Sequence, residues 1–408
     1  MAIRNIVGPI PEPQDLFGRA DLINRCQQTL ETSNLLILAP RRFGKSGVLR
    51  SLNNSERGYL VLSFDLEDVA SPSKFVQRIV ERVAVVPELR HLLRKLGGAF
   101  ESFLDSIQER IEEADLGEGM PGIKFREKLE KTDWQNSATL LLTELEQADQ
   151  PILFLFDELP EMLKKIANSE GDEVASLFMN WFRTVRLDEK DELRRHRFII
   201  AGSTGLNYLL DNRLGCPETL NDFCRETVDP LDMELAKKMC VEVAENNKVE
   251  IDEHAIDLLL ELVGQPVPYF IQLFFSAAAQ DPAVNRKLNK ELVQHVYDSR
   301  LRGPVCKRYF DQYRRRLQQY PPEIETTIIH LLVKVARSPT PCLSSELFEA
   351  YQASRGTDGT SIEFSELMAD MECDWYLTYN ESEESYSFYM NIMRDWWHRW
   401  YSHVGTKA

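Results

Sequence analysis

The chain has 408 residues, of which 43% are hydrophobic and 28% are charged, and its formal net charge is −17. A prior of about 150 residues per domain gives two or three domains. The acidic balance argues against a protein that coats nucleic acid without sequence preference, because phosphate neutralisation needs a basic surface. A local basic patch is still compatible with it.

Seven cysteines are scattered along the chain without any C-x-x-C pair. This pattern is typical of reduced thiols and not of a disulfide framework or a zinc site. The start of the chain has no long apolar segment of the kind a secretory signal needs. No apolar run approaches the roughly 18 residues of a membrane helix. We therefore expect a cytoplasmic protein.

The first distinctive segment is a polar loop between an apolar run and a helix. A proline-punctuated arm over residues 9–13 and a predicted helix over 20–31 precede the apolar run at 35–38, which predicts a strand. The loop then reads A-P-R-R-F-G-K-S over residues 39–46. A strand, a loop ending in Gly-Lys-Ser and a helix form the phosphate-binding loop pattern. The predicted nucleotide-binding residues here are Pro40, Arg41, Arg42, Phe43, Gly44, Lys45, Ser46 and Gly47.

Each residue type at the end of this loop has a physical reason. Gly44 allows the backbone to approach the phosphates closely, and successive backbone N–H groups surround the anion. Lys45 would reach the β- and γ-phosphates, and the Ser46 hydroxyl would ligate Mg²⁺. Ala39 stands where the pattern has glycine, and it would serve there if its φ is negative. The alternative is an ordinary strand–turn–helix with a chance Gly-Lys-Ser.

A second predicted strand at 59–64 ends in acidic residues, and helices with a loop at 117–122 fill the stretch from about 72 to 149. The next apolar run, 151–156, is typical of a parallel strand buried on both faces. It ends in Asp157 and Glu158, at the edge where such sheets bind ligands. Asp157 would hold Mg²⁺ and Glu158 would act as general base toward water. The alternative is an acidic N-cap on the following helix.

A fourth strand is predicted at 198–201, after a helix at 173–187, and a fifth around 227–228. The fourth strand ends in G-S-T-G over residues 202–205. The Ser203 hydroxyl would hydrogen-bond the γ-phosphate or the attacking water, unless the segment is a plain glycine-bounded turn.

With these elements in this order, the chain resembles the AAA+-related P-loop ATPases of the archaeal ATPase (ATPase-2) group, which lie near the STAND signalling ATPases and the origin-recognition initiators. The resemblance covers nearly the whole chain. It rests on F-G-R at 17–19, the loop at 41–46, F-D-E at 156–158, G-S at 202–203, G-Q-P at 264–266 with Y-F at 269–270, and the aromatic segments at 386–388 and 394–397.

The resemblance implies an α/β fold. A five-stranded parallel ATPase core at 1–230 would carry the helical insertion, with the sensor strand beside the phosphate-loop strand. A helical lid at 231–320 and a winged helix-turn-helix domain at 321–408 would follow. It further implies a base pocket formed by Gly18 and Arg19 on one side and Pro266 on the other. Arg213 is the first candidate for an arginine finger and Arg225 the second.

The C-terminal elements predict helices at 323–336, 344–353, 361–371 and 391–403, with two short strands at 375–379 and 386–389. The third helix carries Glu363, Glu366 and Asp370 without a Lys or Arg, and such a helix would repel the DNA groove. We therefore expect the winged helix to bind protein or the rest of its own chain. DNA is retained as an alternative partner because of one run of basic residues: Arg302, Arg308, Arg314, Arg315 and Arg316.

The sequence leaves three alternative functions for this chain. The leading one is an ATPase, with ATP and Mg²⁺ as cofactors, that works as a nucleotide-dependent switch for a partner protein or for self-association, as in prokaryotic defence or stress ATPases. The second is a DNA-handling loader or initiator. The third is a module that binds ATP without turnover.

Overall fold

The computed structural model describes residues 4–53, 58–97, 134–187, 195–202, 205–356 and 359–403. They form two compact units. We call Arg19–Ala39 with Lys45–Val228 the sheet unit, and Met1–Gly18, Pro40–Gly44 and Asp229–Ala408 the C-terminal unit. Among the described helices, none combines the length and the apolar character that crossing a membrane requires.

The sheet unit contains five parallel strands in the order β2-β3-β4-β1-β5. The fourth strand therefore lies beside the strand that leads into the phosphate loop, which confirms the predicted arrangement. The fifth strand begins several residues before the predicted position. The strands are β1 (Asn34–Leu38), β2 (Leu60–Asp65), β3 (Ile152–Asp157), β4 (Arg197–Gly202) and β5 (Phe223–Thr227).

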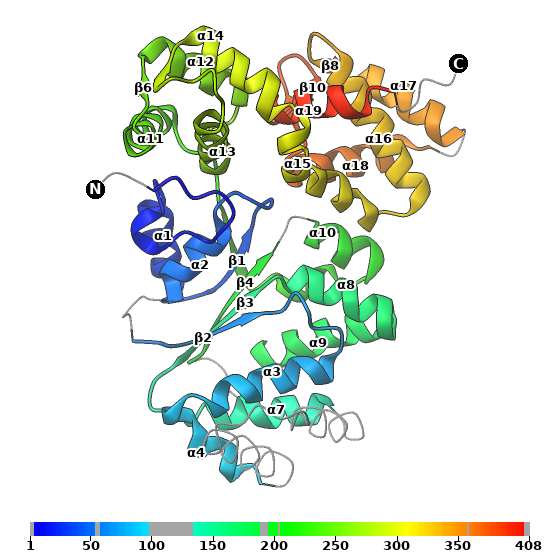
Figure 1. Cartoon of the computed structure of the whole chain (residues 1–408). Helices are drawn as coiled ribbons and strands as arrows, with labels where there is room; N and C mark the ends of the chain where they lie inside the picture. Colours follow the sequence, from blue (N-terminus) through cyan, green and yellow to red (C-terminus); the bar gives the residue numbers. More distant parts are fainter. Residues whose placement is uncertain are drawn as a thin grey trace, which may run out of the picture. The chain divides into compact units, whose positions relative to one another are not determined.

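Helices cover both faces of this sheet (Figure 1). Helices α1 and α2 lie on one face, and α3, α7, α8 and α9 lie on the other, with α4 packed on α3 and α7. The loop predicted at 117–122 lies outside the described residues. The helices are α1 (Ala20–Thr29), α2 (Lys45–Asn53), α3 (Pro72–Ala84), α4 (Pro87–Lys95), α7 (Trp134–Leu145), α8 (Leu159–Glu170), α9 (Asp172–Leu187) and the short α10 (Leu206–Tyr208).

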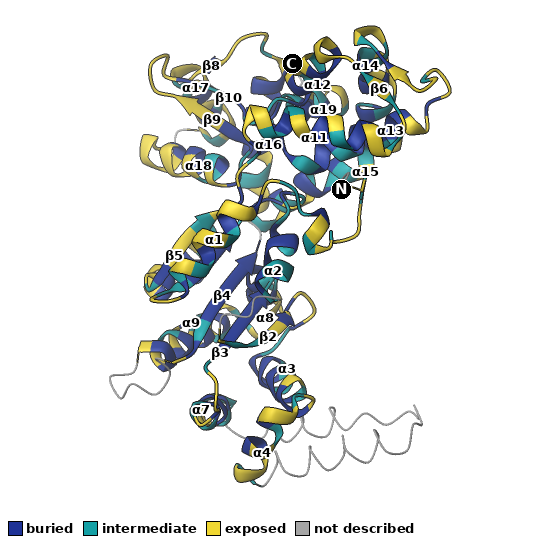
Figure 2. Cartoon of the chain, turned by 90° about the vertical axis from the view of Figure 1, so that its left-hand side faces the viewer, coloured by how far each residue is buried: buried dark blue, intermediate teal, exposed yellow. Residues whose placement is uncertain are grey.

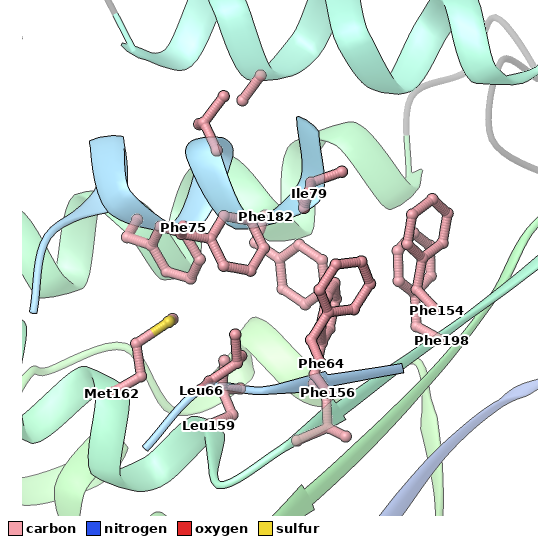
Figure 3. Close-up of a cluster of buried hydrophobic side chains, with 14 of the residues drawn as sticks. Phe64, Leu66, Phe75, Ile79, Phe154, Phe156, Leu159, Met162, Phe182 and Phe198 are labelled. Atoms are coloured by element: carbon pink, nitrogen blue, oxygen red, sulfur yellow. The ribbon is translucent and has the colours of Figure 1, made fainter. Parts of the chain in front are cut away.

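The central strands are buried along their length (Figure 2). On the face covered by α3 and α9, aromatic rings form the core (Figure 3). Phe154 stacks on Phe198 with ring centroids 5.1 Å apart, and Phe156 contacts Phe75 at 5.3 Å. Because successive strand residues point to opposite faces, an unbroken apolar strand needs cover on both sides. The helices supply that cover, as the apolar run at 151–156 predicts.

A buried ion pair ties α9 to the edge of the sheet. The Arg186 side chain, 1% exposed, contacts both carboxylate oxygens of Asp222, at 3.0 and 2.9 Å. It also donates to the carbonyl oxygens of Phe182 and Thr219, and Asn34 of β1 donates to Asp222. Burial alone would raise the pKa of Asp222, but the hydrogen bonds from Arg186 outweigh it and lower that pKa.

The C-terminal unit consists mainly of helices. Two short sheets accompany them, the parallel pair β6-β7 and the antiparallel β8-β10-β9. All four helices predicted after residue 320 are present. The elements are α11 (Met233–Asn246), β6 (Glu250–Ile251), α12 (Glu253–Val263), α13 (Pro268–Ala279), β7 (Lys287–Leu288), α14 (Lys290–Val296), α15 (Pro304–Arg316), α16 (Pro322–Arg337), β8 (Cys342–Leu343), α17 (Ser344–Arg355), α18 (Ser361–Cys373), β9 (Leu377–Asn380), β10 (Ser385–Phe388) and α19 (Asn391–Tyr401).

Helix α19 connects the helices before residue 320 of this unit with those after it, because it packs on α12 and α15 and also on α16. The ring of Trp396 stacks on that of Phe310, with centroids 5.9 Å apart. Tyr297 donates a hydrogen bond to Asp395, and Asn391 donates to the carbonyl oxygen of Glu261. The tryptophan-rich last helix is thus a packing element, as its aromatic density indicates.

We expect Asp222→Asn to destabilise the protein by about 3 kcal/mol at neutral pH, because it leaves the buried Arg186 guanidinium without its counter-ion. The midpoint of thermal unfolding measures this loss. The pKa of Asp222 is lower in the folded state than its unfolded value of 3.8. The difference between the two proteins should therefore shrink as the pH falls below about 3.8, because Asp222 of the unfolded wild type is protonated first and the stabilisation by its charge is lost progressively. A difference that stays constant down to pH 2 would contradict this assignment.

Candidate functional site

The phosphate loop connects β1 to α2, so the predicted strand–loop–helix is present. Arg42 has a φ of 79° and Gly44 a φ of 94°, whereas Phe43 between them is not left-handed. Backbone that alternates in this way turns successive N–H groups toward one side and forms an anion-binding concavity. Ala39 is not among the residues with positive φ and is fully buried. An alanine side chain is therefore accepted at this position without backbone strain.

The lysine that opens α2 faces the acidic pair that ends β3. Lys45 Nζ lies 3.1 Å from Glu158 Oε1 and 3.6 Å from Asp157 Oδ1. The Lys45 side chain is only 7% exposed. The structure thus brings together three residues predicted from two separate motifs. Asp65, at the end of β2, is in register with Asp157 and adds a further carboxylate at the same edge.

These carboxylates are suited to a cation. Burial raises the pKa of Asp157, and the charges of Glu158 and Asp65 raise it further, while Lys45 lowers it. Glu158 Oε2 is buried and has no hydrogen-bond partner among the described residues. One lysine does not neutralise three acidic groups, and oxygen donors are the ligands that Mg²⁺ prefers. Asp157, and the Ser46 hydroxyl that directly follows Lys45 in the sequence, are oxygen donors of the type that Mg²⁺ prefers.

Glu158 has an unusual backbone conformation, with φ 59° and ψ 35°. A bulky residue in the left-handed region is uncommon and persists only where its surroundings fix it. The residue precedes α8, and its N–H donates to the carboxylate of Asp157. This strained turn directs the Glu158 carboxylate toward Lys45. No sequence pattern indicates it, because Glu is not a residue that favours positive φ.

The end of β4 packs tightly against the start of α8. A Cβ on Gly202 would clash with the ring of Pro160, so only glycine fits there. The carbonyl of Gly202 also accepts a hydrogen bond from the N–H of Ala39. The predicted residue Ser203 lies outside the described residues. Because Gly202 has no side chain, Pro160 can lie against the end of β4. Pro160 follows Glu158 by two residues, and Gly202 directly precedes Ser203 in the sequence.

Two of the predicted base-pocket residues lie close together in the C-terminal unit. Gly18, with φ 65°, lies against the side chain of Leu231, and the N–H of Leu231 donates to the carbonyl oxygen of Pro266. Gly18 and Pro266 are thus both neighbours of Leu231. Arg19 belongs to the sheet unit, where its side chain is buried.

The candidate arginine finger and the basic run have partners of their own. Arg213 pairs with Asp172 at 2.9 Å and donates to Asn168. In the basic run, acidic residues pair with Arg302 (Asp298), Arg314 (Glu325) and Arg316 (Asp374). No described carboxylate pairs with Arg308 or Arg315, which are both exposed. A hollow of about 420 Å³ adjoins them and is lined by Lys307, Arg308, Asp311, Arg314, Arg315 and Tyr401.

Two solved structures resemble the chain over nearly its whole length. One is the Walker-type ATPase PABY2304 of Pyrococcus abyssi, with a TM-score of 0.61 and 15% identity over 96% of this chain and 99% of that chain. Another is the Aeropyrum pernix ORC2 protein in its ADPNP–ADP complexes, with a TM-score of 0.52 and 11% identity over 97% and 94%. The fold is that of the P-loop AAA+ ATPases. No protein-family model matches the sequence, and no curated protein matches it either.

We expect Gly202→Ala to cost about 1–3 kcal/mol of stability, because the new methyl group overpacks the contact with Pro160. Pro160→Ala removes the ring atoms involved, so the cost of Gly202→Ala should be much smaller in that background. Thermal midpoints of the two single variants and the double variant measure the interaction. Costs that simply add would show that Pro160 is not the residue that excludes a side chain at position 202.

Proposed function

We propose that this chain is a Mg²⁺-dependent ATPase that works as a nucleotide-dependent switch. The observation that carries the proposal is the buried contact of Lys45 with Asp157 and Glu158 at the end of β3. A phosphate loop places its lysine beside the acidic end of a parallel strand in order to bind a nucleoside triphosphate and its metal. The fold similarity to P-loop ATPases supports this interpretation.

The chain's residues would divide the work as follows. The N–H groups of the loop and Lys45 bind the β- and γ-phosphates, and Ser46 and Asp157 hold the metal. Mg²⁺, when bound, neutralises charge that develops on the phosphate oxygens. Glu158 accepts the proton of the attacking water while the water oxygen bonds to the γ-phosphorus and the bond to ADP breaks. Glu158 accepts a hydrogen bond from Lys45, so transfer of Lys45 to the phosphates would free this carboxylate for water.

Other predicted residues have roles that depend on nucleotide or on a second subunit. Ser203 would hydrogen-bond the γ-phosphate or the water, and Gly18, Arg19 and Pro266 would contact the base. Arg213 would have to leave Asp172 and Asn168 to act as an arginine finger toward a neighbouring subunit. Asp172 holds it by an exposed ion pair, which costs little to break.

We further propose that the output is an interaction with a protein, either a partner or a second copy of this chain, in the cytoplasm. The face of α18 supports this: Glu363 and Glu366 are exposed there, next to Ile362, which is 71% exposed. An acidic face with an exposed apolar residue repels phosphates and is compatible with a protein surface. The sequence resemblance to STAND-like ATPases supports a role for such a switch in prokaryotic defence or stress signalling.

Steady-state hydrolysis of Mg·ATP tests the first part of the proposal. We expect turnover by the wild type and a loss of about 10²- to 10⁴-fold in Glu158→Gln, because the general base is removed while the shape of the side chain is kept. Nucleotide binding should survive in Glu158→Gln and be lost in Lys45→Ala, and chelation of Mg²⁺ should abolish turnover.

Glu161→Gln is the matched control, because Glu161 lies one turn further along α8 and pairs with Lys164. It should hydrolyse ATP at the wild-type rate. Binding of ATP without turnover in any of these proteins would favour a binding module over an enzyme. Absence of binding would refute the proposed function.

The hollow beside α15 favours DNA binding as a second candidate function. Arg308 and Arg315 are exposed on one side of α15, seven residues apart, without acidic partners in the described part of the chain. Tyr401 adds an aromatic ring to the lining. Arg308 donates to the hydroxyl of Tyr309, but neither guanidinium has a carboxylate partner among the described residues, so both can contact phosphate oxygens. The acidic face of α18 would repel these oxygens.

If the chain binds duplex DNA in this way, the double variant Arg308→Ala, Arg315→Ala should bind it more weakly. The slope of log affinity against log salt concentration should become shallower by about two, because about two phosphate contacts are lost. Electrophoretic mobility shifts at several salt concentrations measure both effects. Arg302→Ala, which removes an arginine already paired with Asp298, is the control. No shift by the wild type at low salt would eliminate this candidate.

A further inference from the structure

The tip of the phosphate loop belongs to the C-terminal unit, although the strand before it and the helix after it belong to the sheet unit. Aromatic residues of the C-terminal unit contact three consecutive loop residues. The Tyr313 hydroxyl donates to the carbonyl oxygen of Arg41 at 3.2 Å. The Arg42 guanidinium lies over the ring of Tyr269, 4.9 Å from its centroid.

Phe43 makes the third contact. Its side chain is fully buried and meets the ring of Trp375 edge to face, with centroids 4.8 Å apart. Trp375 is itself left-handed, with φ 61°, and packs against Tyr389 at 4.8 Å. We call Tyr269, Tyr313 and Trp375 the aromatic clamp. Its three residues come from α13, from α15 and from the turn between α18 and β9.

Tyr313, one member of the clamp, is fixed by buried neighbours. Tyr313 is 2% exposed, and its carbonyl accepts a hydrogen bond of 2.7 Å from the hydroxyl of Tyr376, the residue after Trp375. Tyr376 in turn contacts the ring of Trp397 in α19. Tyr313 and Tyr376 are buried rings with satisfied hydroxyl groups, which have few alternative positions, whereas the buried hydroxyl of Tyr269 has no hydrogen-bond partner among the described residues. The loop is therefore attached to a fixed part of the core of the C-terminal unit.

The conformation of the loop requires such support. Arg42 occupies the left-handed region, which a non-glycine residue adopts at a cost and keeps only when its surroundings fix it. The Arg42 side chain is held by Tyr269 and by the carbonyl oxygen of Gly8, and its neighbours on each side are held by Tyr313 and Trp375. The alternation of Arg42 and Gly44 is what turns the N–H groups toward an anion.

We propose that the aromatic clamp is a positioning device for the phosphate loop: it holds Arg41–Phe43 in the anion-binding shape, so that nucleotide and the C-terminal unit stabilise the same loop conformation. The effect on nucleotide rests on the proposed function, whereas the effect on the loop itself does not. By linkage, whatever loosens the clamp weakens nucleotide binding, and nucleotide binding strengthens the clamp by the same factor.

The test compares two buried tyrosines of the C-terminal unit in the full chain. Tyr313→Phe removes only the hydroxyl that binds Arg41. Tyr297→Phe is the control, because it also removes a buried hydroxyl that lies within hydrogen-bond distance of a backbone carbonyl, that of Leu262 at 3.1 Å, and of the Asp395 carboxylate, and that does not contact the loop. Phe43→Leu, which removes the ring contact with Trp375, is a second test variant. Hydrogen exchange of peptides that cover residues 41–47 and equilibrium titration with Mg·ATP are measured for each protein.

We expect the loop amides of nucleotide-free Tyr313→Phe and Phe43→Leu to exchange faster than those of the wild type. We expect Mg·ATP to bind these variants about 2- to 10-fold more weakly, the range for loss of one hydrogen bond or ring contact. Tyr297→Phe should leave both quantities unchanged even if it lowers the thermal midpoint. Unchanged loop exchange in both test variants would overturn the inference. If the wild type binds Mg·ATP, an unchanged affinity for Mg·ATP in both test variants would overturn it as well. If the wild type does not bind Mg·ATP, the proposed function fails, and loop exchange alone decides whether the clamp shapes the loop.

Discussion

One lysine faces two carboxylates at the end of β3, and the architecture of the sheet unit serves to place these three groups. Lys45 comes from the first turn of α2, and Asp157 and Glu158 come from a strand buried on both faces. The parallel order of β3, β4 and β1 brings the end of each strand to the same edge. Burial makes the contact strong, because charges in a low-dielectric site interact strongly and are costly to leave unpaired.

Much of this arrangement could be predicted from the sequence because its signals are local. An apolar run of six residues indicates a buried strand, and Gly-Lys-Ser after such a run indicates a phosphate loop. The acidic pair after β3 follows the same logic, and Lys45 does lie beside Asp157 and Glu158. The position of β4 between β3 and β1, by contrast, followed from the family resemblance and not from any residue pattern.

The contacts of the loop with the aromatic clamp could not be predicted in this way. Tyr313 and Arg41 are 272 residues apart, and no periodicity relates them. The left-handed conformations of Arg42, Glu158 and Trp375 are equally invisible in the sequence, since these side chains do not favour positive φ. Long-range packing determines these features, so they appear only once the fold is known.

Arg42 and Glu158, which both have a strained left-handed backbone, indicate what this long-range packing achieves. Glycine would adopt the backbone of Arg42 or Glu158 at no steric cost, so the strain is kept for the sake of the side chains. Arg42 uses its guanidinium on Tyr269 and on the carbonyl of Gly8, and Glu158 uses its carboxylate on Lys45. Local rules are broken in this way where a side chain is needed for function and its surroundings can hold it in place. Under the proposed function, Arg42 would shape the loop for phosphate and Glu158 would be the base, so each strained backbone would be kept for a side chain with its own task.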